Sequence, residues 1–187
     1  EGAVEVVHAG MGSTTLGLPR SPVPCSWAPV QLGATAANIS RAPGLESTIV
    51  DQDVEQRLWL KLAANCVINP LTALHRCLNG HVFDLPGFGA VAHDVCAEIH
   101  DLAATLPGSS ACPPPDDLLQ FVHSTVQETS HNQSSMLQDV VAKRTTEIQV
   151  LNAWVTRQGK VHGVNTPRNS ELARRVTELT QFSDGPR

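Results

Sequence analysis

The chain has 187 residues, enough for one domain or for one domain and part of another, and its 13 basic and 18 acidic residues give a formal net charge of -5. It has no Lys/Arg stripe for nucleic-acid phosphates, no apolar run near the roughly 20 residues that a membrane-spanning helix needs, and no secretory signal pattern. These features exclude nucleic-acid and membrane partners and indicate a water-soluble protein, which we expect in the cytoplasm, with an organelle as the alternative.

The first fifty residues are predicted to form strands and turns. The apolar alternation begins at once and predicts a hairpin, with arms at Val4–His8 and Ser13–Gly17 around a glycine-containing turn. Trp27–Ser40 is predicted to form a short helix and Ser47–Val50 a last strand. Because residue 1 is Glu rather than Met, we expect a fragment of a longer chain, although proteolytic processing would leave the same trace.

From Asp53 onward, long helical patterns separated by Gly/Pro loops replace the strands, so we expect a domain boundary near residue 52. The remainder is predicted to be all-α, with Pro107–Pro114 as a linker. The helices are predicted over Val54–Cys77, Gly89–Leu106, Pro115–Glu128, Ser135–Arg157 and Arg168–Gln181.

A polar stripe is predicted along the first of these helices. Lys61, Asn65 and Asn69 recur every four residues within an otherwise apolar run. At about 100° per residue, two such steps rotate by only about 80°, so the three side chains share one face. Short amides beside an ammonium suit the recognition of hydroxyls and carboxylates, although a solvent-facing stripe is the alternative. Pro70 is expected to interrupt the helix directly afterwards and to free a carbonyl.

A second polar segment opens the fourth predicted helix. Ser135 and Gln138 fit a capping box, which would leave free N–H groups and a positive dipole end at Ser135 for an anion. Glu147 lies 12 residues further on, so we expect it on the same helix and facing the same cleft. The alternative is that Ser134 and Ser135 merely cap a helix and that Glu147 is a solvated charge.

These segments resemble the two signature sequences of ketopantoate reductases (2-dehydropantoate 2-reductases). Residues 61–74, followed shortly by Asn79-Gly80, are similar to the signature that opens the helical domain of that family. Ser134–Asp139 together with Thr146–Ile148 resembles the second signature. Both occur in the family order and at about the family distance, so the resemblance is specific.

The resemblance extends over nearly the whole chain and implies a mostly α fold. Val6–Gly10 with Gly17 is similar to the late hairpin of the family's Rossmann domain. Residues 1–52 would then be the carboxy-terminal remnant of the NADP-binding α/β Rossmann domain, comprising the hairpin, a short helix and a strand. Residues 53–187 would be the all-helical substrate domain.

The family resemblance implies hydride transfer from NADPH to the C2 ketone of 2-dehydropantoate, which gives (R)-pantoate on the route to pantothenate and coenzyme A. Lys61 would donate the proton, because an ammonium both stabilises the developing alkoxide and supplies its proton. The other implied site residues are Asn65, Asn69 and Asn79 at the substrate oxygens, Ser135, Met136, Leu137 and Gln138 near its carboxylate, and Glu147 at the cofactor, with no metal.

The sequence also departs from the family pattern. Gln149 stands where the family usually has an acidic residue, and Asn152 is followed by Ala153 rather than Gly. The family's amino-terminal GxGxxG loop and its substrate-contacting Asn in the nucleotide domain are absent. We therefore expect the chain by itself not to bind NADPH productively and to be inactive without the missing half.

Two other functional interpretations stay open besides the 2-dehydropantoate 2-reductase. A non-catalytic, reductase-like module for binding or assembly would lack the cofactor domain, and a sister reductase would act on another 2-keto acid. Assembly of the chain into a homodimer is also left open.

The sequence argues against metal sites and hydrolase chemistry. Five widely spaced cysteines without a CxxC pair predict neither a disulfide framework nor a zinc site, and eight histidines without HExxH spacing predict no metal. The absence of GxSxG argues against a serine hydrolase.

Overall fold

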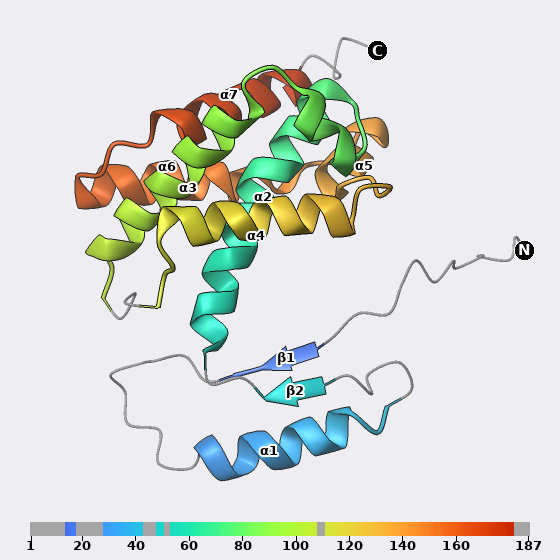
Figure 1. Ribbon diagram of the computed structural model, residues 1–187, viewed down its shortest axis with the longest axis vertical. Coiled ribbons are helices and arrows are strands. Elements are labelled where there is room, and N and C mark those ends of the chain that lie inside the picture. The colour runs from blue at the N-terminus through green and yellow to red at the C-terminus, as the bar shows by residue number, and fades with distance from the viewer. Residues whose placement is uncertain (1–13, 18–27, 43–47, 51–52, 108–110, 182–187) are drawn as a thin grey trace, which may run out of the picture. The chain divides into compact units, whose positions relative to one another are not determined.

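The structure is a computed structural model that describes residues 14–17, 28–42, 48–50, 53–107 and 111–181. The chain divides into two compact units, Glu1–Glu55 and Gln56–Arg187 (Figure 1).

The first unit contains a strand, a helix and a second strand. Strand β1 (Thr14–Leu16) and strand β2 (Thr48–Val50) pair in parallel, with Thr14 opposite Thr48, and helix α1 (Ala28–Ile39) lies between them in sequence. A parallel pair needs such a crossover connection. The predicted helix and last strand are therefore confirmed. The described strand of the expected hairpin pairs with β2, and the other expected arm, Val4–His8, lies outside the described residues.

From Val54 onward the described chain is helical, as predicted (Figure 1). The early turns of α2 are largely exposed, whereas its later turns are buried among the other helices. The helices are α2 (Val54–His75), the 3-10 helix η1 (Asn79–Asp84), α3 (Phe88–Thr105), α4 (Pro115–Glu128), α5 (Ser135–Val141), the 3-10 helix η2 (Glu147–Gln149), α6 (Asn152–His162) and α7 (Pro167–Gln181).

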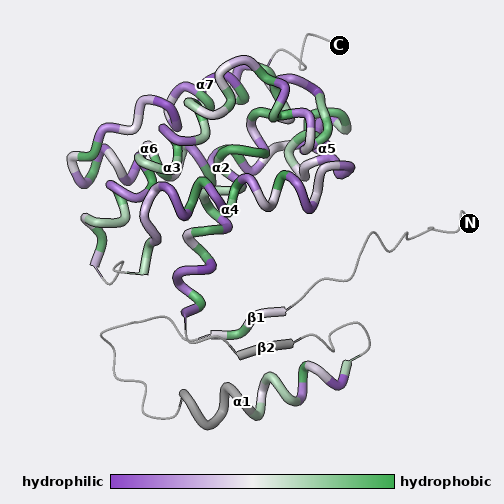
Figure 2. Tube along the Cα trace, viewed as in Figure 1, coloured by the Kyte–Doolittle hydropathy of each residue, from purple (hydrophilic) through white to green (hydrophobic). Residues whose placement is uncertain are grey.

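One apolar core joins the helices of the second unit. Hydrophobic residues mix with hydrophilic ones along each helix, which is the pattern of helices that bury one face (Figure 2). Fully buried members of this core include Val67 of α2, Ile99 and Leu102 of α3, Val122 of α4, Met136 of α5, Val155 of α6 and Val176 of α7.

The ends of four predicted helices agree with the structure to within two residues, but the single helix predicted over Ser135–Arg157 is wrong. The structure divides it into α5, η2 and α6. Lys143 adopts a left-handed backbone with φ of 54°, and the Arg144 N–H donates to the Asp139 carbonyl at 2.8 Å, which closes the turn that ends α5. A salt bridge of 2.8 Å between the side chains of Arg144 and Asp139 holds the same turn.

Pro70 does not interrupt α2, so that expectation is also wrong. The helix continues past Pro70 to His75. Proline has no N–H, and the carbonyl four residues earlier therefore lacks its usual donor. That carbonyl belongs to Cys66, and it accepts a hydrogen bond of 2.9 Å from the side-chain amide of Asn152 on α6. A tertiary contact thus replaces the missing bond of the helix.

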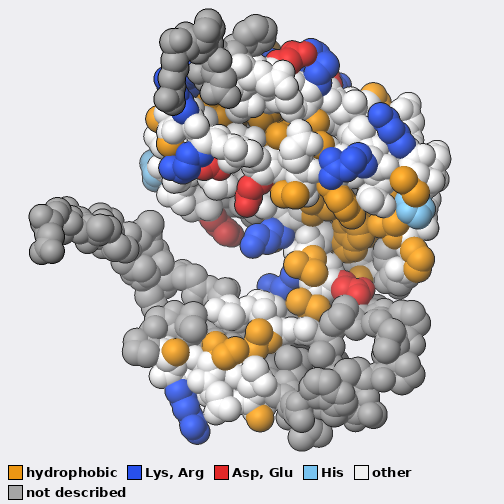
Figure 3. Space-filling view, turned by 180° about the vertical axis from the view of Figure 1, so that it is seen from behind, with side chains coloured by type: hydrophobic (Ala, Val, Ile, Leu, Met, Phe, Trp, Pro, Cys, Tyr) orange, Lys and Arg blue, Asp and Glu red, His pale blue; other side chains and the backbone are white. Residues whose placement is uncertain are grey.

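The surface of the helical unit carries scattered charges and a group of hydrophobic side chains on one face (Figure 3). The large hydrophobic side chains that are exposed in the described residues are Leu58, Phe83, Phe121, Val141, Val150 and Val161. No helix in the described parts of the chain has the length and apolar character to cross a membrane.

Candidate functional site

The predicted polar stripe lies on the uninterrupted helix α2. Lys61 is exposed, Asn65 is half-buried and Asn69 is 7 % exposed, so the stripe leads from the surface toward the core. Their four-residue spacing on one helix places the three side chains along the same side. Within the residues that the structure describes, none of these side chains has a hydrogen-bond or ion-pair partner. Their polar groups are therefore available to a ligand.

A buried pair of hydroxyls joins the start of α5 to α2, one turn beyond Asn69. The hydroxyl oxygens of Thr72 and Ser134 lie 2.7 Å apart, and both residues are buried. Thr72 donates to the Ile68 carbonyl at 2.8 Å, so its oxygen accepts the hydrogen of Ser134. The Ser134 oxygen in turn accepts the N–H of Leu137 at 3.1 Å. This chain of bonds fixes α5 beside the polar stripe.

The capping box expected at Ser135 is wrong by one residue, because Ser134 is the capping residue of α5. Gln138 donates its side-chain amide to the Gln133 carbonyl at 3.1 Å instead of completing a box. Ser135 is exposed, whereas the side chains of Met136 and Leu137 are buried in the core. In the described part of the chain, the backbone N–H groups of Ser135 and Met136 have no acceptor.

Asn79 is fixed to the loop that leads into α5. Its side-chain amide donates to the Thr129 hydroxyl at 2.9 Å, and its backbone N–H donates to the Asn132 carbonyl at 3.0 Å. A Cβ on the following residue, Gly80, would lie 2.8 Å from the Cβ of Ser130, so this approach requires glycine. The Asn79 side-chain oxygen is buried without a partner among the described residues, which leaves one acceptor free.

Glu147 does not share a helix with Ser135. It is exposed and begins η2, and the turn after α5 separates it from Ser135, so the expectation that both share a helix is wrong. The structure places Lys61, Asn65 and Asn69 on one helix and links that helix to the Ser134–Ser135 pair. No hydrogen bond or ion pair in the described part of the chain joins Glu147 to this group.

The sequence analysis missed Asn152 and the buried network that it belongs to. Its side-chain amide donates one hydrogen to the Cys66 carbonyl and the other to the Asn169 side-chain oxygen at 3.0 Å. The Asn169 amide donates to Glu98 at 2.8 Å, and Glu98 also accepts the backbone N–H groups of Arg168 and Asn169 at the start of α7. Pro70 was the signal, because a proline inside a helix requires a donor for a carbonyl four residues earlier.

Burial keeps the thiols of three described cysteines from being activated as nucleophiles. Burial, and secondarily the neighbouring thiol of Cys112, raises the pKa of Cys96 to about 12, and burial raises the pKa of Cys112 to about 12. Burial also raises the pKa of the Cys66 thiol. Thiols with raised pKa values are poor nucleophiles near neutral pH. No group of His, Cys, Asp or Glu in the described residues is arranged to hold a metal ion.

The sequence between β1 and α1 lacks the glycine pattern of a dinucleotide-binding turn. A dinucleotide-binding turn requires a glycine-rich loop between a strand and the start of a helix. Between β1 and α1 the sequence has Gly17 and then Pro19, Pro22 and Pro24, without a second glycine.

Comparison with known proteins identifies the chain's relatives. Residues 53–180 match the family model described as ketopantoate reductase PanE/ApbA C terminal. The 2-dehydropantoate 2-reductase of Vibrio cholerae is 34% identical over 177 residues, which are 95% of this chain and 56% of that protein. The chain therefore spans about half the length of the curated relatives it matches.

Solved structures show the same fold. A PanE/ApbA family ketopantoate reductase from Ralstonia eutropha superimposes with a TM-score of 0.77 at 25% identity, over 95% of this chain and 54% of that one. D-mandelate dehydrogenase in a ternary structure with NADH and anilino(oxo)acetate has a TM-score of 0.77 at 19% identity, over 92% of this chain and 53% of that one. At that identity, the likeness to the dehydrogenase concerns the fold alone.

Proposed function

Because this chain belongs to the ketopantoate reductase PanE/ApbA C-terminal family, we propose that it is the substrate-binding part of an NADPH-dependent 2-dehydropantoate 2-reductase. The observation that carries the proposal is the α2 stripe, in which Lys61, Asn65 and Asn69 have no partner among the described residues. Unpartnered amides and an ammonium on one helix face match a small ligand that is rich in oxygen atoms.

Lys61 is the proton donor in this proposal. Reduction of a ketone places negative charge on its oxygen, and a nearby ammonium both stabilises that charge and neutralises it by proton transfer. The exposed position of Lys61 on the early turns of α2 leaves it accessible to substrate. Asn65 and Asn69 hold the substrate's hydroxyl and carbonyl oxygens deeper along the same face.

The remaining polar groups would orient the substrate. Ser135 and the backbone N–H groups at the start of α5 would bind its carboxylate, supported by the bond between Thr72 and Ser134. Asn79 would hold a further substrate oxygen, a role that rests on the family resemblance alone. Glu147 would contact the cofactor, a role that rests on the family resemblance alone.

The proposal divides the protein into two functional parts. Residues 1–52 are the end of an NADP-binding Rossmann domain, consistent with the parallel pair β1 and β2 joined by α1, and residues 53–187 are the substrate domain. The dinucleotide phosphates would be held by residues outside this chain. We expect the complete enzyme to act in the cytoplasm or in an organelle, and a homodimer stays a prediction.

The experiment uses the full reading frame that contains this chain and follows NADPH absorbance with 2-dehydropantoate as substrate. Lys61→Ala should lower kcat/KM by about 10²–10⁴-fold, the usual contribution of a general acid. Lys160→Ala, which removes an exposed lysine on α6, is the matched control and should leave the rate unchanged. Equal rates in the two variants would remove Lys61 from the mechanism.

A non-catalytic binding or assembly module is the alternative against which the reductase proposal is tested. Calorimetry of the 187-residue chain with 2-dehydropantoate, without NADPH, separates substrate recognition from catalysis. Binding that is weakened by Asn69→Ala supports the reductase site. Absence of substrate binding, together with a full reading frame that lacks a GxGxxG segment, supports the module.

A sister reductase for another 2-keto acid is tested in the same assay. The complete enzyme should show a higher kcat/KM for 2-dehydropantoate than for 2-keto acids without its hydroxyl, because a buried amide such as Asn69 would then be left unpaired. A higher kcat/KM for a 2-keto acid without that hydroxyl would identify a different substrate.

A further inference from the structure

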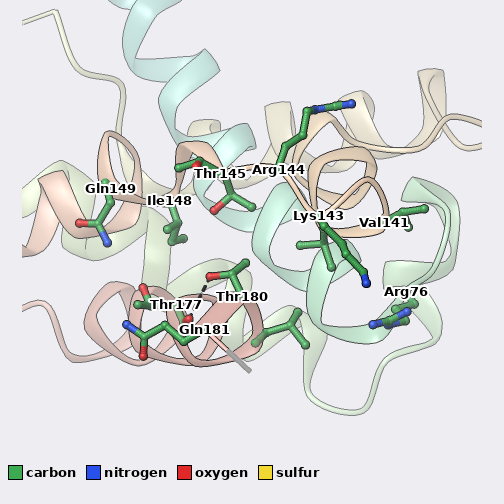
Figure 4. A pocket seen from close by; sticks show the side chains of 13 residues that line it. Arg76, Val141, Lys143, Arg144, Thr145, Ile148, Gln149, Thr177, Thr180 and Gln181 are labelled. Atoms are coloured by element: carbon green, nitrogen blue, oxygen red, sulfur yellow. Dashed lines mark hydrogen bonds between the residues drawn. The ribbon is translucent and has the colours of Figure 1, made fainter. Parts of the chain in front are cut away.

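One hollow of the helical unit is rich in positive charge and is not lined by Lys61, Asn65 or Asn69. It encloses about 360 Å³ at the ends of α2, α5 and α7. Cationic, hydroxyl and amide side chains dominate its polar lining: Arg76, Lys143 and Arg144, with Thr145, Thr146, Thr177, Thr180, Gln149 and Gln181 (Figure 4). None of the described residues that line it is acidic, in a chain whose formal net charge is -5.

Two of the three cations remain without a counter-ion. Arg144 forms a salt bridge of 2.8 Å with Asp139, and its side chain points away from the others in Figure 4. Lys143 is directed toward the side of the hollow on which Arg76 lies (Figure 4). In the described part of the chain, neither Arg76 nor Lys143 has an ion-pair or side-chain hydrogen-bond partner. Two positive charges therefore face the same space unpaired.

The backbone at these two cations is unusual. Arg76 and Lys143 have φ values of 51° and 54°, and they are the non-glycine residues with positive φ in the described chain. Each lies just after the end of a helix. The backbone N–H of the residue that follows it donates to the carbonyl five residues earlier, from Cys77 to Thr72 and from Arg144 to Asp139. The end of α6 has the same bond, from Val164 to Gly159, but uses Gly163 at the left-handed position.

The comparison with α6 shows that this turn normally suits glycine, which adopts positive φ without steric cost. A cation at the end of a helix gains some stability from the helix dipole. The dipole explains a charge near each end, but it does not explain why two strained cations from different helices face one hollow without an acidic partner. Strained residues that cluster around a cavity are typical of ligand sites.

We propose that this hollow binds the phosphate group of a small molecule, through Arg76 and Lys143 with the exposed Thr145 hydroxyl as a further donor. Guanidinium and ammonium groups bind phosphate oxygens by charge-assisted hydrogen bonds. A volume of about 360 Å³ lies at the lower end of the roughly 300–1,000 Å³ of small-molecule sites, so it suits inorganic phosphate or a short phosphate ester. This site is independent of the reductase proposal.

The test measures thermal unfolding of the 187-residue chain with inorganic phosphate, with glycerol phosphate, and with chloride at the same ionic strength. Either phosphate should raise Tm by about 2–4 °C at saturation relative to chloride. A larger rise with the ester identifies an esterified ligand, and an equal rise identifies the free ion.

The variants Arg76→Gly and Lys143→Gly separate phosphate binding from folding. Each should weaken phosphate binding without lowering the stability of the fold. Each removes a cation but relieves the left-handed strain, so Tm in chloride should stay equal or rise by about 2 °C while the apparent Kd for phosphate increases about tenfold. Lys160→Ala removes an exposed cation outside the hollow and should keep the full response to phosphate. No response to phosphate beyond chloride, or equal responses in all three variants, would overturn the proposal.

Discussion

At the scale of single residues, Asn152 determines how α2 tolerates a proline. Its side-chain amide donates to the Cys66 carbonyl and to the side-chain oxygen of Asn169, and both asparagines are 0 % exposed. Water has no access to replace these bonds. An unsatisfied acceptor in such an environment costs about 1–3 kcal/mol. The continuation of α2 past Pro70 therefore depends on a residue of α6.

Replacement of Asn152 by alanine should lower the free energy of unfolding by about 2–4 kcal/mol, because two buried acceptors lose their donor. Urea denaturation measures this change. In a Pro70→Ala background the restored N–H can donate to the Cys66 carbonyl, so the same substitution should cost about 1 kcal/mol less. An identical cost in both backgrounds would show that Asn152 does not compensate for the proline.

At the scale of elements, α2 and α3 each place a thiol in the apolar core. Cys66 and Cys96 are both 0 % exposed. Burial, and secondarily the other thiols, raises both pKa values above the ordinary 9.0, that of Cys96 to about 12. The neutral thiols are compatible with the core, whereas their thiolates are not. The folded state should therefore lose stability in alkaline solution.

The pH dependence follows from these raised values. Unfolded thiols lose their protons near pH 9 and the folded ones only at much higher pH, so the stabilisation is complete below pH 9 and is lost as pH rises toward 12. Above pH 9, the free energy of unfolding should fall by up to about 1.4 kcal/mol per pH unit for each thiol. Urea titrations at pH 8 to 10.5 measure the slope.

The double variant Cys66→Ala, Cys96→Ala is the control for that slope. It will be less stable at every pH because of lost packing, but its stability should fall less steeply above pH 9. Parallel slopes for both proteins would assign the alkaline loss to other groups.

Element boundaries show where sequence patterns are informative. The bounds of α4 are as predicted, because Pro115 is favoured at a first helical position and Asp116 and Asp117 suit the first turn. The break after α5 was missed, because Lys143 adopts the left-handed conformation without a Gly or Pro to indicate it. Its turn is stabilised instead by the bonds between Arg144 and Asp139, which depend on the folded backbone.

At the scale of the whole molecule, the second unit has a contiguous apolar core of its own. Its buried hydrophobic members run from Ala63 on α2 to Val176 on α7. A contiguous core of this kind is what an independently folding domain requires.

We therefore expect residues 53–187 to fold without the first 52 residues. The shortened chain should show a helical circular dichroism spectrum and one cooperative thermal transition, because its core is complete. Its Tm should lie within about 4 °C of the full chain, the shift that corresponds to roughly 1 kcal/mol. A non-cooperative transition would show that the first unit is needed for folding.

The sequence by itself determined the fold class, the helix that carries the stripe and the family, because helical periodicity and signature residues are local properties of the chain. It also identified Lys61, Asn65, Asn69 and Ser135 as candidates, whose roles stay predictions. Only the tertiary structure decided that Ser134 caps α5 against Thr72, that Asn152 serves the carbonyl freed by Pro70, and that Arg76 and Lys143 face one hollow. These features join residues far apart in the chain, and no local pattern encodes which distant partner satisfies a buried polar group.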